Sequence, residues 1–440
     1  MRNNNKKLAK NASYLIIVQL VNLALPFISL PIISRILGVE NFGLINYAIA
    51  FVNYFILLID YSFNFTATRL VIQKLDKPKE IEKIFNQILS TKIVLFLIST
   101  CLFLIIIYLV ELNHTTKILM SITFLYTIST VLNNNWMYQA FQNLSKVAIF
   151  SLINKLTFTI LILYFVQKKD DLIIYSLIYS LTAIITSALS FYYIVKNYSI
   201  KFSFVRVKEI LNILQKEHLV FLSLIVISCY TTSNIIILGI TSSATEIGLF
   251  SSSEKIIVLI TTILNISFSQ ALYPYITQSF NTSKELGINK VQKILPITTS
   301  MVAICCCFTF ILSDFIVNIL YGTEFTSAIF LIKVMIIIPI FISFSNMFGI
   351  QLMLNLKLDK QLLIITCIGA FLGITSNFIL SSKFHALGTC ISWIISEFFI
   401  TLFMYIILRK NGINPINLNY YHPAFIKTQF KSLLMTIVKK

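Results

Sequence analysis

The sequence contains little charge, and most of that charge has one sign. Charged residues make up 12% of the 440 residues, against 57% hydrophobic residues and a mean hydropathy of +0.85. Because a soluble domain carries about 25% charged residues, this composition excludes an ordinary soluble fold. Only 17 carboxylate side chains accompany 35 lysines and arginines, which gives a formal net charge of +18.

Residues that commonly build catalytic or metal centres are also scarce. The four histidines are scattered, with no spacing typical of zinc sites or catalytic triads. The seven cysteines are odd in number, lie in apolar runs and have no metal-ligand spacing, so we expect them to be free. The GxxxxGK(S/T) loop that binds nucleotide phosphates is absent. We therefore expect no cofactor, no use of ATP and no enzymatic activity.

Long uncharged runs dominate the rest of the sequence. Each is as long as the ~18–20 apolar residues that a membrane-spanning helix needs. They do not alternate between apolar and polar residues as β-barrel strands do. We expect an all-α polytopic membrane protein with about twelve spans by this length rule. The runs lie at 13–34, 42–63, 93–110, 118–145, 147–167, 172–195, 219–245, 256–283, 294–313, 334–356, 361–382 and 385–408.

Positive charge in the connections predicts the orientation in the membrane. Counted from the N-terminus, alternate connections hold 26 of the 35 lysines and arginines, and the intervening connections hold five. This bias predicts an even number of spans with both termini in the cytoplasm. The basic residues would then lie beside lipid headgroups, so we expect no nucleic-acid partner. Lys92, near a cytoplasmic helix end, is expected to extend its ammonium group to the membrane surface.

Two sequence echoes indicate an internal repeat. Leu37-Gly38 opens the predicted second helix, and Leu238-Gly239 opens the eighth. Likewise Gln139 and Asn143 close the fourth helix, and Gln351 and Asn355 close the tenth. This spacing favours two parallel six-helix halves, a bundle at 1–205 and a second at 206–410. The remaining segment, 411–440, is predicted to be a cytoplasmic tail. Its apolar residues recur at near-helical spacing, which favours an interfacial helix over a frayed end.

Several segments resemble bacterial polysaccharide flippases of the O-antigen (Wzx) type. The resemblance covers nearly the whole chain in collinear order, although it says nothing about the particular sugar. The segments are RILGVENFGLINYAIAFVNYFILLIDYSFNFTATR at 35–69, NNWMYQAFQNLSKVAI at 134–149, ATEIGLFSSSEKIIVLI at 244–260, LYGTEF at 320–325 and NMFGIQLMLNLKLDK at 346–360.

This resemblance implies the fold of the multidrug/oligosaccharidyl-lipid/polysaccharide exporters, in which two six-helix bundles flank a central cavity. It implies a substrate as well, an O-antigen or capsule repeat unit on undecaprenyl pyrophosphate. The repeat unit would be moved from the inner to the outer leaflet of the bacterial inner membrane. The implied partners are membrane lipids and the polysaccharide polymerase and glycosyltransferases of the same pathway.

Three lysines lie inside the apolar runs or directly at their edges. A charge at the centre of a spanning helix costs roughly 2.5–3.5 kcal/mol, so it is normally retained only where it faces protein or water. We predict that Lys155, Lys255 and Lys333 line the cavity and bind the anionic headgroup. Arg35 and Arg69, which flank the second helix within the resemblance, complete this cationic set, with Arg69 at the cytoplasmic entrance. The alternative is that these side chains extend to the membrane surface.

Three carboxylates also lie in apolar surroundings. Asp60, Glu254 and Glu397 are candidates for binding and releasing H⁺ or Na⁺ as the cavity alternates, which would couple transport to an ion gradient. A structural hydrogen-bonding role is the alternative for each. We expect Glu254 and Lys255 not to pair with each other, because adjacent helical residues point about 100° apart.

An aromatic and amide cluster lies where the predicted fourth helix ends. Trp136, Tyr138, Gln139 and Gln142 are candidates for sugar contact, since sugars bind aromatic faces and amides. The alternative is that the aromatic residues lie at the membrane interface, as Trp and Tyr commonly do.

Two other functions remain open from the sequence. A multidrug-type exporter would share the fold but would be expected to have fewer buried cations and a more apolar pocket. A membrane polysaccharide polymerase or ligase would be expected to carry a long external loop with catalytic residues. The outward connections predicted here are short, so the sequence favours the flippase.

Overall fold

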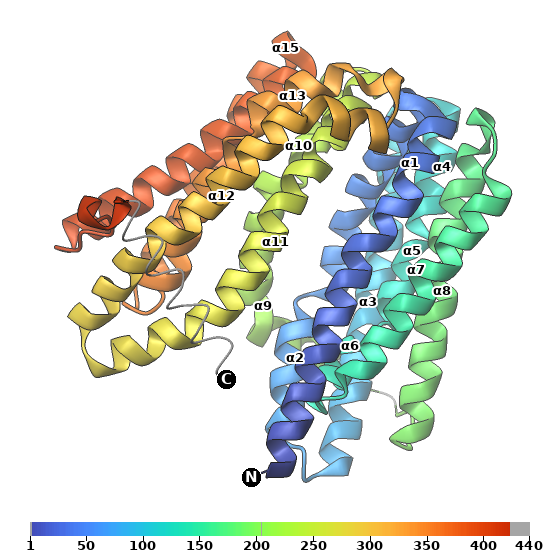
Figure 1. Cartoon of the computed structure of the whole chain (residues 1–440). Helices are drawn as coiled ribbons and strands as arrows, with labels where there is room; N and C mark the ends of the chain where they lie inside the picture. The colour runs from blue at the N-terminus through green and yellow to red at the C-terminus, as the bar shows by residue number, and fades with distance from the viewer. Residues whose placement is uncertain (1, 204, 423–440) are drawn as a thin grey trace. The chain divides into compact units, whose positions relative to one another are not determined.

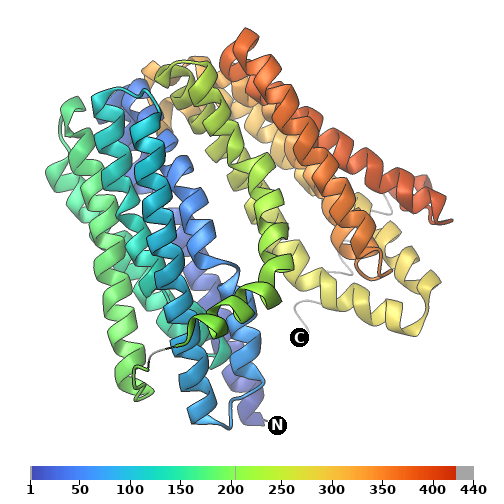
Figure 2. The same ribbon diagram turned by 180° about the vertical axis from the view of Figure 1, so that it is seen from behind.

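Every regular element in the described part of the chain is a helix (Figures 1 and 2). The computed structural model describes residues 2–203 and 205–422, with side chains except those of 2–27, 230, 263–271 and 274. The predicted interfacial helix near 424–438 lies outside these residues. The all-α prediction is confirmed. The helices are α1 (Arg2–Asp60), α2 (Phe63–Ile72), α3 (Pro78–Leu109), α4 (His114–Phe124), α5 (Tyr126–Leu132), α6 (Asn135–Ala140), α7 (Leu144–Phe165), α8 (Leu172–Asn197), α9 (Val207–Thr231), α10 (Ser233–Thr241), α11 (Ala244–Thr282), α12 (Lys284–Leu320), α13 (Ser327–Met335), α14 (Ile338–Asn346), the π-helix η3 (Met347–Met353) and α15 (Asp359–Lys410).

The outer surfaces of the long helices are apolar. Within the described residues, nine helical stretches are long and apolar enough to cross a membrane. Large apolar side chains are exposed on them, such as Leu97 and Leu104 on α3 and Ile311 and Phe315 on α12. Water would disfavour so much exposed apolar surface, whereas lipid tails cover it without cost. The chain is a multi-pass membrane protein.

The chain folds into two compact units, and each is described by itself. Unit 1 comprises Met1–Ser228 with Leu320–Gly322, and unit 2 comprises Cys229–Ile319 with Thr323–Lys440. The sequence predicts the division at 205/206, before α9, whereas the contacts divide the chain inside α9. The difference arises because the first part of α9 packs on unit 1. There the ring of Phe221 stacks on that of Tyr61, with the ring centroids 4.1 Å apart.

Two of the long helices contain a sharp break. α1 breaks at Gly38, whose φ of 75° lies in the left-handed region that glycine adopts readily. α15 breaks at His385, with φ 52° and ψ −130°. Its two halves run antiparallel, since the space left by Gly369 before the break is filled by Ile400 after it. Each of these helices therefore consists of two, while the full twelve-span layout remains a prediction.

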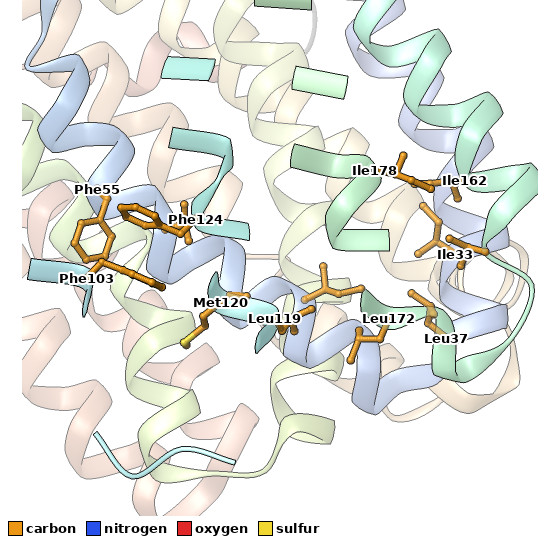
Figure 3. Packing of buried hydrophobic residues seen from close by; sticks show 14 residues of the cluster. Ile33, Leu37, Phe55, Phe103, Leu119, Met120, Phe124, Ile162, Leu172 and Ile178 are labelled. Carbon is orange, nitrogen blue, oxygen red and sulfur yellow. The ribbon is translucent and has the colours of Figure 1, made fainter. Parts of the chain in front are cut away.

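Aromatic packing joins the helices of unit 1 (Figure 3). Phe55 of α1, Phe103 of α3 and Phe124 of α4 lie together in its core. The Phe103 and Phe124 rings stack with centroids 4.1 Å apart, and Phe55 meets both edge-on, at 5.9 and 5.3 Å. Such pairs contribute about 0.5–1.5 kcal/mol each beyond the apolar area they bury. A second cluster, around Phe85 and Trp136, fills the region near α2, α3 and α6.

The core of unit 2 is built around the π-helix η3. Buried Phe348 and Leu352 of η3 pack with Ile276 of α11, Leu295 of α12 and Met404 of α15. A π-helical turn interrupts the regular i to i−4 hydrogen bonding, and such turns are frequent at functional sites. It follows the helix break at Ile336 and Ile337, just before Pro339 near the start of α14. The tenth predicted span is therefore irregular along much of its length.

Candidate functional site

One end of unit 1 brings basic connections together. Near the start of α3, Lys83 Nζ lies 3.8 Å from Glu209 Oε2 at the start of α9. One turn further along α3, Asn86 Nδ2 donates to the Lys201 carbonyl, at 2.9 Å, in the connection between α8 and α9. The lysine-rich start of α3 and the lysine-rich α8–α9 connection are therefore neighbours. This end of unit 1 carries a concentration of positive charge.

Arg69 lies in α2 and pairs with a carboxylate that sequence reasoning missed. Its Nη2 is 3.4 Å from Glu217 Oε2 on α9; the Arg69 side chain is 62% exposed and the Glu217 side chain 8%. The pair fastens α9 to α2 within unit 1. Because the guanidinium is mostly exposed, its remaining N–H groups are accessible to an anion. The predicted role of Arg69 at an entrance remains a prediction.

Arg35 lies far from Arg69 within the same unit. It precedes the break at Gly38, where the stem of its side chain packs over Gly322. The helical segment 39–60 separates this break from the end of α1, a length of roughly 33 Å at 1.5 Å per residue. The structure therefore does not bring the two arginines together, and one small ligand could not contact both in this conformation.

Lys155 lies on the bundle-facing side of α7. The buried residues Thr159 and Ile162 follow it at i+4 and i+7, on the same face of the helix. Ile153 and Ile160, which are exposed, mark the opposite face toward lipid. The Lys155 side chain itself is half-buried. Its position at membrane depth, directed away from lipid, suits the predicted contact with an anionic headgroup.

Lys92 is buried in unit 1, so the expectation that it extends to the membrane surface is wrong. Its side chain is 1% exposed, and its Nζ lies 3.1 Å from Asp60 Oδ1. It also donates to the carbonyl groups of Thr130 and Asn133, each at 3.2 Å. A single buried lysine thus binds a carboxylate and two backbone oxygens. Asp60, a predicted ion-coupling residue, already has a cationic partner.

The charges of α11 point in different directions. Glu254 is half-buried and follows three buried serines, whereas Lys255 is exposed together with Val258 one turn later. The predicted divergence of these neighbours fits their unequal exposure. Lys255 therefore lies on an open face of unit 2, within a helix of 39 residues.

Glu397 lies inside unit 2, on the second half of α15. It is 5% exposed, and Trp393, one turn earlier on the same helix, is equally buried. Of the three predicted coupling carboxylates, it is the most enclosed in side-chain packing. An acidic side chain is retained so deeply in a spanning helix only where a partner or a function compensates its cost.

Lys333 is already partnered, on the outer face of unit 2. Its Nζ lies 3.1 Å from Asp314 Oδ2 and 5.9 Å from the centroid of the Phe310 ring. Asp314 is 62% exposed, between the exposed apolar residues Ile311 and Phe315 of α12. The pair therefore lies on the face that carries lipid-exposed side chains. This arrangement weighs against Lys333 as a cavity residue, because its charge is neutralised by a neighbour on that outer face.

The predicted sugar-contact cluster divides into buried and exposed members. Trp136 and Tyr138 are completely buried in the core of unit 1. Trp136 Nε1 donates to Asn134 Oδ1 at 3.1 Å, and the Tyr138 hydroxyl donates to the Ser190 carbonyl at 3.0 Å. Gln139 and Gln142 are exposed. In this structure the aromatic faces serve packing, and only the two amides are accessible to a ligand.

A buried amide pair in unit 2 was not predicted. Asn377 Nδ2 on α15 donates to Asn234 Oδ1 on α10 at 3.1 Å, and both side chains are buried. Hydrogen bonds of this kind join helices inside a membrane, where water cannot compete for the polar groups. Single amides within apolar runs were the available sequence signal, but the sequence does not identify which amides pair.

Long apolar helices with polar and charged side chains inside the units define a polytopic membrane protein. The chain belongs to a family described as polysaccharide biosynthesis protein, whose model matches residues 8–280. The family resemblance predicted from the sequence is confirmed.

Two relatives are similar to this chain over almost their whole lengths. A candidate O-antigen transporter of Escherichia coli (strain K12) is 28% identical over 415 residues, which cover 93% of this chain and 99% of the relative. A candidate O-antigen transporter of Shigella dysenteriae is 27% identical over 399 residues, covering 90% and 98%. These relatives are named as transporters and not as enzymes.

Solved structures share the fold at low sequence identity. The lipid II flippase MurJ, in an inward closed conformation, matches with a TM-score of 0.69 and 17% identity over 96% of this chain and 92% of that one. An inward-facing multidrug resistance MATE transporter of the MOP superfamily matches with a TM-score of 0.62 and 12% identity, over 90% and 94%. At these identities the likeness shows the fold alone.

The burial of Trp136 predicts a structural role. Replacing it in a Trp136→Ala variant should lower the free energy of unfolding by about 3–5 kcal/mol, because it leaves a large cavity in a packed core. Thermal melting of the purified protein in detergent measures this. Gln139→Ala, one turn away and exposed, is the matched control and should change stability by less than about 0.5 kcal/mol. Unchanged stability with impaired transport in the Trp136 variant would instead favour sugar contact.

Proposed function

We propose that this protein is a flippase for lipid-linked oligosaccharides. The substrate is an O-antigen or capsule repeat unit on undecaprenyl pyrophosphate, moved from the inner to the outer leaflet of the bacterial inner membrane by alternating access. The observation that carries the proposal is the end-to-end similarity to two candidate O-antigen transporters, within a family of polysaccharide biosynthesis proteins. A shared whole-chain length argues for a shared task more strongly than a shared motif does.

The charge pattern supports an anionic substrate. A pyrophosphate group that enters the membrane needs cationic partners, since little water remains to solvate it. Lys155 on the bundle-facing side of α7, Lys255 on the open face of α11, Arg35 near the α1 break and Arg69 at the basic end of unit 1 are the proposed partners. Lys333 ranks below these because its ammonium group lies on the outer face of unit 2, beside exposed apolar residues of α12.

An ion gradient is the proposed energy source. The sequence has no nucleotide-binding loop, and moving one charge across 100 mV supplies about 2.3 kcal/mol. Glu254 and Glu397 in unit 2 are the proposed coupling residues for H⁺ or Na⁺. Asp60 is a weaker candidate, because an exchangeable cation would have to displace the Lys92 ammonium that contacts it.

Both termini are proposed to lie in the cytoplasm. The count of basic residues in alternate connections supports this orientation. The contacts between the basic start of α3 and the basic α8–α9 connection support it too, because they gather such segments at one end of unit 1. The pathway's polymerase and glycosyltransferases remain the proposed functional partners.

Deleting the gene in the bacterium of origin tests the proposed function. We expect loss of the polymerised surface polysaccharide, with lipid-linked repeat units accumulating on the cytoplasmic side, where an external lectin cannot reach them. Intact surface polysaccharide with altered drug susceptibility would contradict the proposal and favour a multidrug exporter. Single repeat units at the outer surface, present but not polymerised, would favour a polymerase.

Expressing variants of the protein in the deletion strain tests the proposed cationic partners of the substrate. A Lys155→Met variant should lower surface polysaccharide about ten-fold or more, since a charge-assisted contact contributes about 1.5–3 kcal/mol. Quantification of the polysaccharide relative to the amount of protein in the membrane measures the effect. The matched control is the double variant Lys333→Met/Asp314→Asn, which removes a neutral pair and should keep normal export. Equal export by both variants would remove Lys155 from the proposed site.

A further inference from the structure

Two interrupted helices meet inside unit 1. α1 ends at Asp60, and the two residues after it, Tyr61 and Ser62, adopt left-handed conformations with φ of 44° and 70°. α5 ends at Leu132, where Asn133 is extended, with φ −74° and ψ 117°, before α6 begins. A helix that ends within a membrane protein leaves its last carbonyl groups without intrahelical partners. Both ends therefore need a donor or a positive charge close by.

Lys92 supplies that charge to two backbone carbonyls at the end of α5 and to the side-chain carboxylate of the last residue of α1. It is the fifteenth residue of the 32-residue helix α3, and its ammonium group lies between the other two helices. Its three contacts are Asp60 Oδ1 at 3.1 Å, the Thr130 carbonyl at 3.2 Å and the Asn133 carbonyl at 3.2 Å. An ammonium group has three N–H donors, so the number of donors equals the number of acceptors. The second carboxylate oxygen, Asp60 Oδ2, accepts from Asn64 Nδ2 at 2.9 Å.

The three oxygens form a set that binds hard cations. A carboxylate and backbone carbonyl groups are typical ligands of alkali and alkaline-earth ions, and carbonyls at the C-terminal end of a helix carry partial negative charge. In transporters, interrupted helices commonly present such carbonyls to a bound cation. Here the position at the centre of the oxygens is occupied by Nζ of a side chain that is 1% exposed.

We propose that Lys92 is a tethered cation, which occupies a cation-binding site of unit 1 permanently. The oxygens of Asp60, Thr130 and Asn133 are the site, and the side chain of α3 replaces an exchangeable ion. Lys92 is then a positioning residue. It holds the end of α1 and the α5–α6 break together. α6 carries exposed Gln139 and leads directly into the turn with exposed Gln142. As far as it concerns ion coupling, this inference rests on the proposed function, since unit 1 would bind no ion here during transport.

Shortening the side chain should convert the site into one for a free ion. In a Lys92→Ala variant the three oxygens remain, but the charge and the side chain that filled the space are gone. Asp60 is 20% exposed, so a small ion can reach the vacated position. If Lys92 were purely structural, the Lys92→Ala variant would be destabilised to the same degree in every salt. If Lys92 fills a cation site, the stability of this variant should depend on which cation is present.

The experiment is thermal melting of the purified full-length protein in NaCl, KCl or N-methylglucamine chloride at equal ionic strength. Lys92→Ala should melt several degrees below the unaltered protein in N-methylglucamine chloride. Saturating Na⁺ or K⁺ should raise its melting temperature by roughly 3–5 °C. The unaltered protein and Lys208→Ala, which lacks one exposed lysine of the same unit, should show no such difference. Neither should the double variant Asp60→Asn/Lys92→Ala, because it has lost the carboxylate ligand.

A salt response of Lys92→Ala equal to that of the unaltered protein would overturn the proposal. So would failure of this variant to fold in any of the salts while the double variant folds, since the ions would then not replace the ammonium group. The melting experiment requires no transport, so its failure is distinct from a failure of the proposed function. The gene-deletion experiment, by contrast, tests the proposed function whether or not Lys92 fills a cation site.

Discussion

In a membrane every polar group that leaves water needs a partner within the protein, and this constraint determines where the helices of the chain can be interrupted. Lys92 shows how it is met. One ammonium group binds the last carboxylate of α1 and two carbonyls at the end of α5, so that two helices can end inside unit 1. Removing one partner from a buried ion pair typically costs about 3–5 kcal/mol, a large share of the 5–15 kcal/mol by which proteins are stable.

The same constraint distinguishes the charges of the chain from one another. Lys92 and Lys333 each have a carboxylate partner, the first buried in unit 1 and the second on the outer face of unit 2. Lys155 lies on the bundle-facing side of α7, and Glu397 is enclosed within unit 2. We propose that Lys92 holds helices of unit 1 together, that Lys155 meets the substrate and that Glu397 meets the coupling ion.

The sequence was sufficient for the fold class and the family, but it could not assign the charged residues correctly. Span lengths follow from bilayer thickness, so uncharged runs locate spanning helices well. The burial of the Lys92 side chain could not be predicted from uncharged runs. Its α3 neighbours Leu95 and Phe103 are buried, while Leu97 and Leu104 are exposed, so both faces of the helix are apolar. In a soluble helix, the polar face would have shown which side is buried.

The sequence also could not predict which side chains pair between helices. Lys333 and Asp314 are 19 residues apart, on helices joined by a turn, and Arg69 and Glu217 are 148 residues apart. Such pairs depend on how helices pack and not on local spacing. The same holds for Trp136 and Tyr138, because an aromatic residue near a helix end can lie at the membrane interface or in the core. Packing within unit 1 buried both.

In the proposed function, this chain alone moves a lipid-linked oligosaccharide across a bilayer. Reconstitution of the purified protein into vesicles that carry such a lipid on the inner leaflet tests it most directly. An impermeant lectin or oxidant added outside reports the sugars that reach the outer leaflet. We expect accessible sugar to rise above that of protein-free vesicles in the presence of an ion gradient. Accessibility that stays at the protein-free level with correctly folded protein, under gradients of both H⁺ and Na⁺, would contradict it.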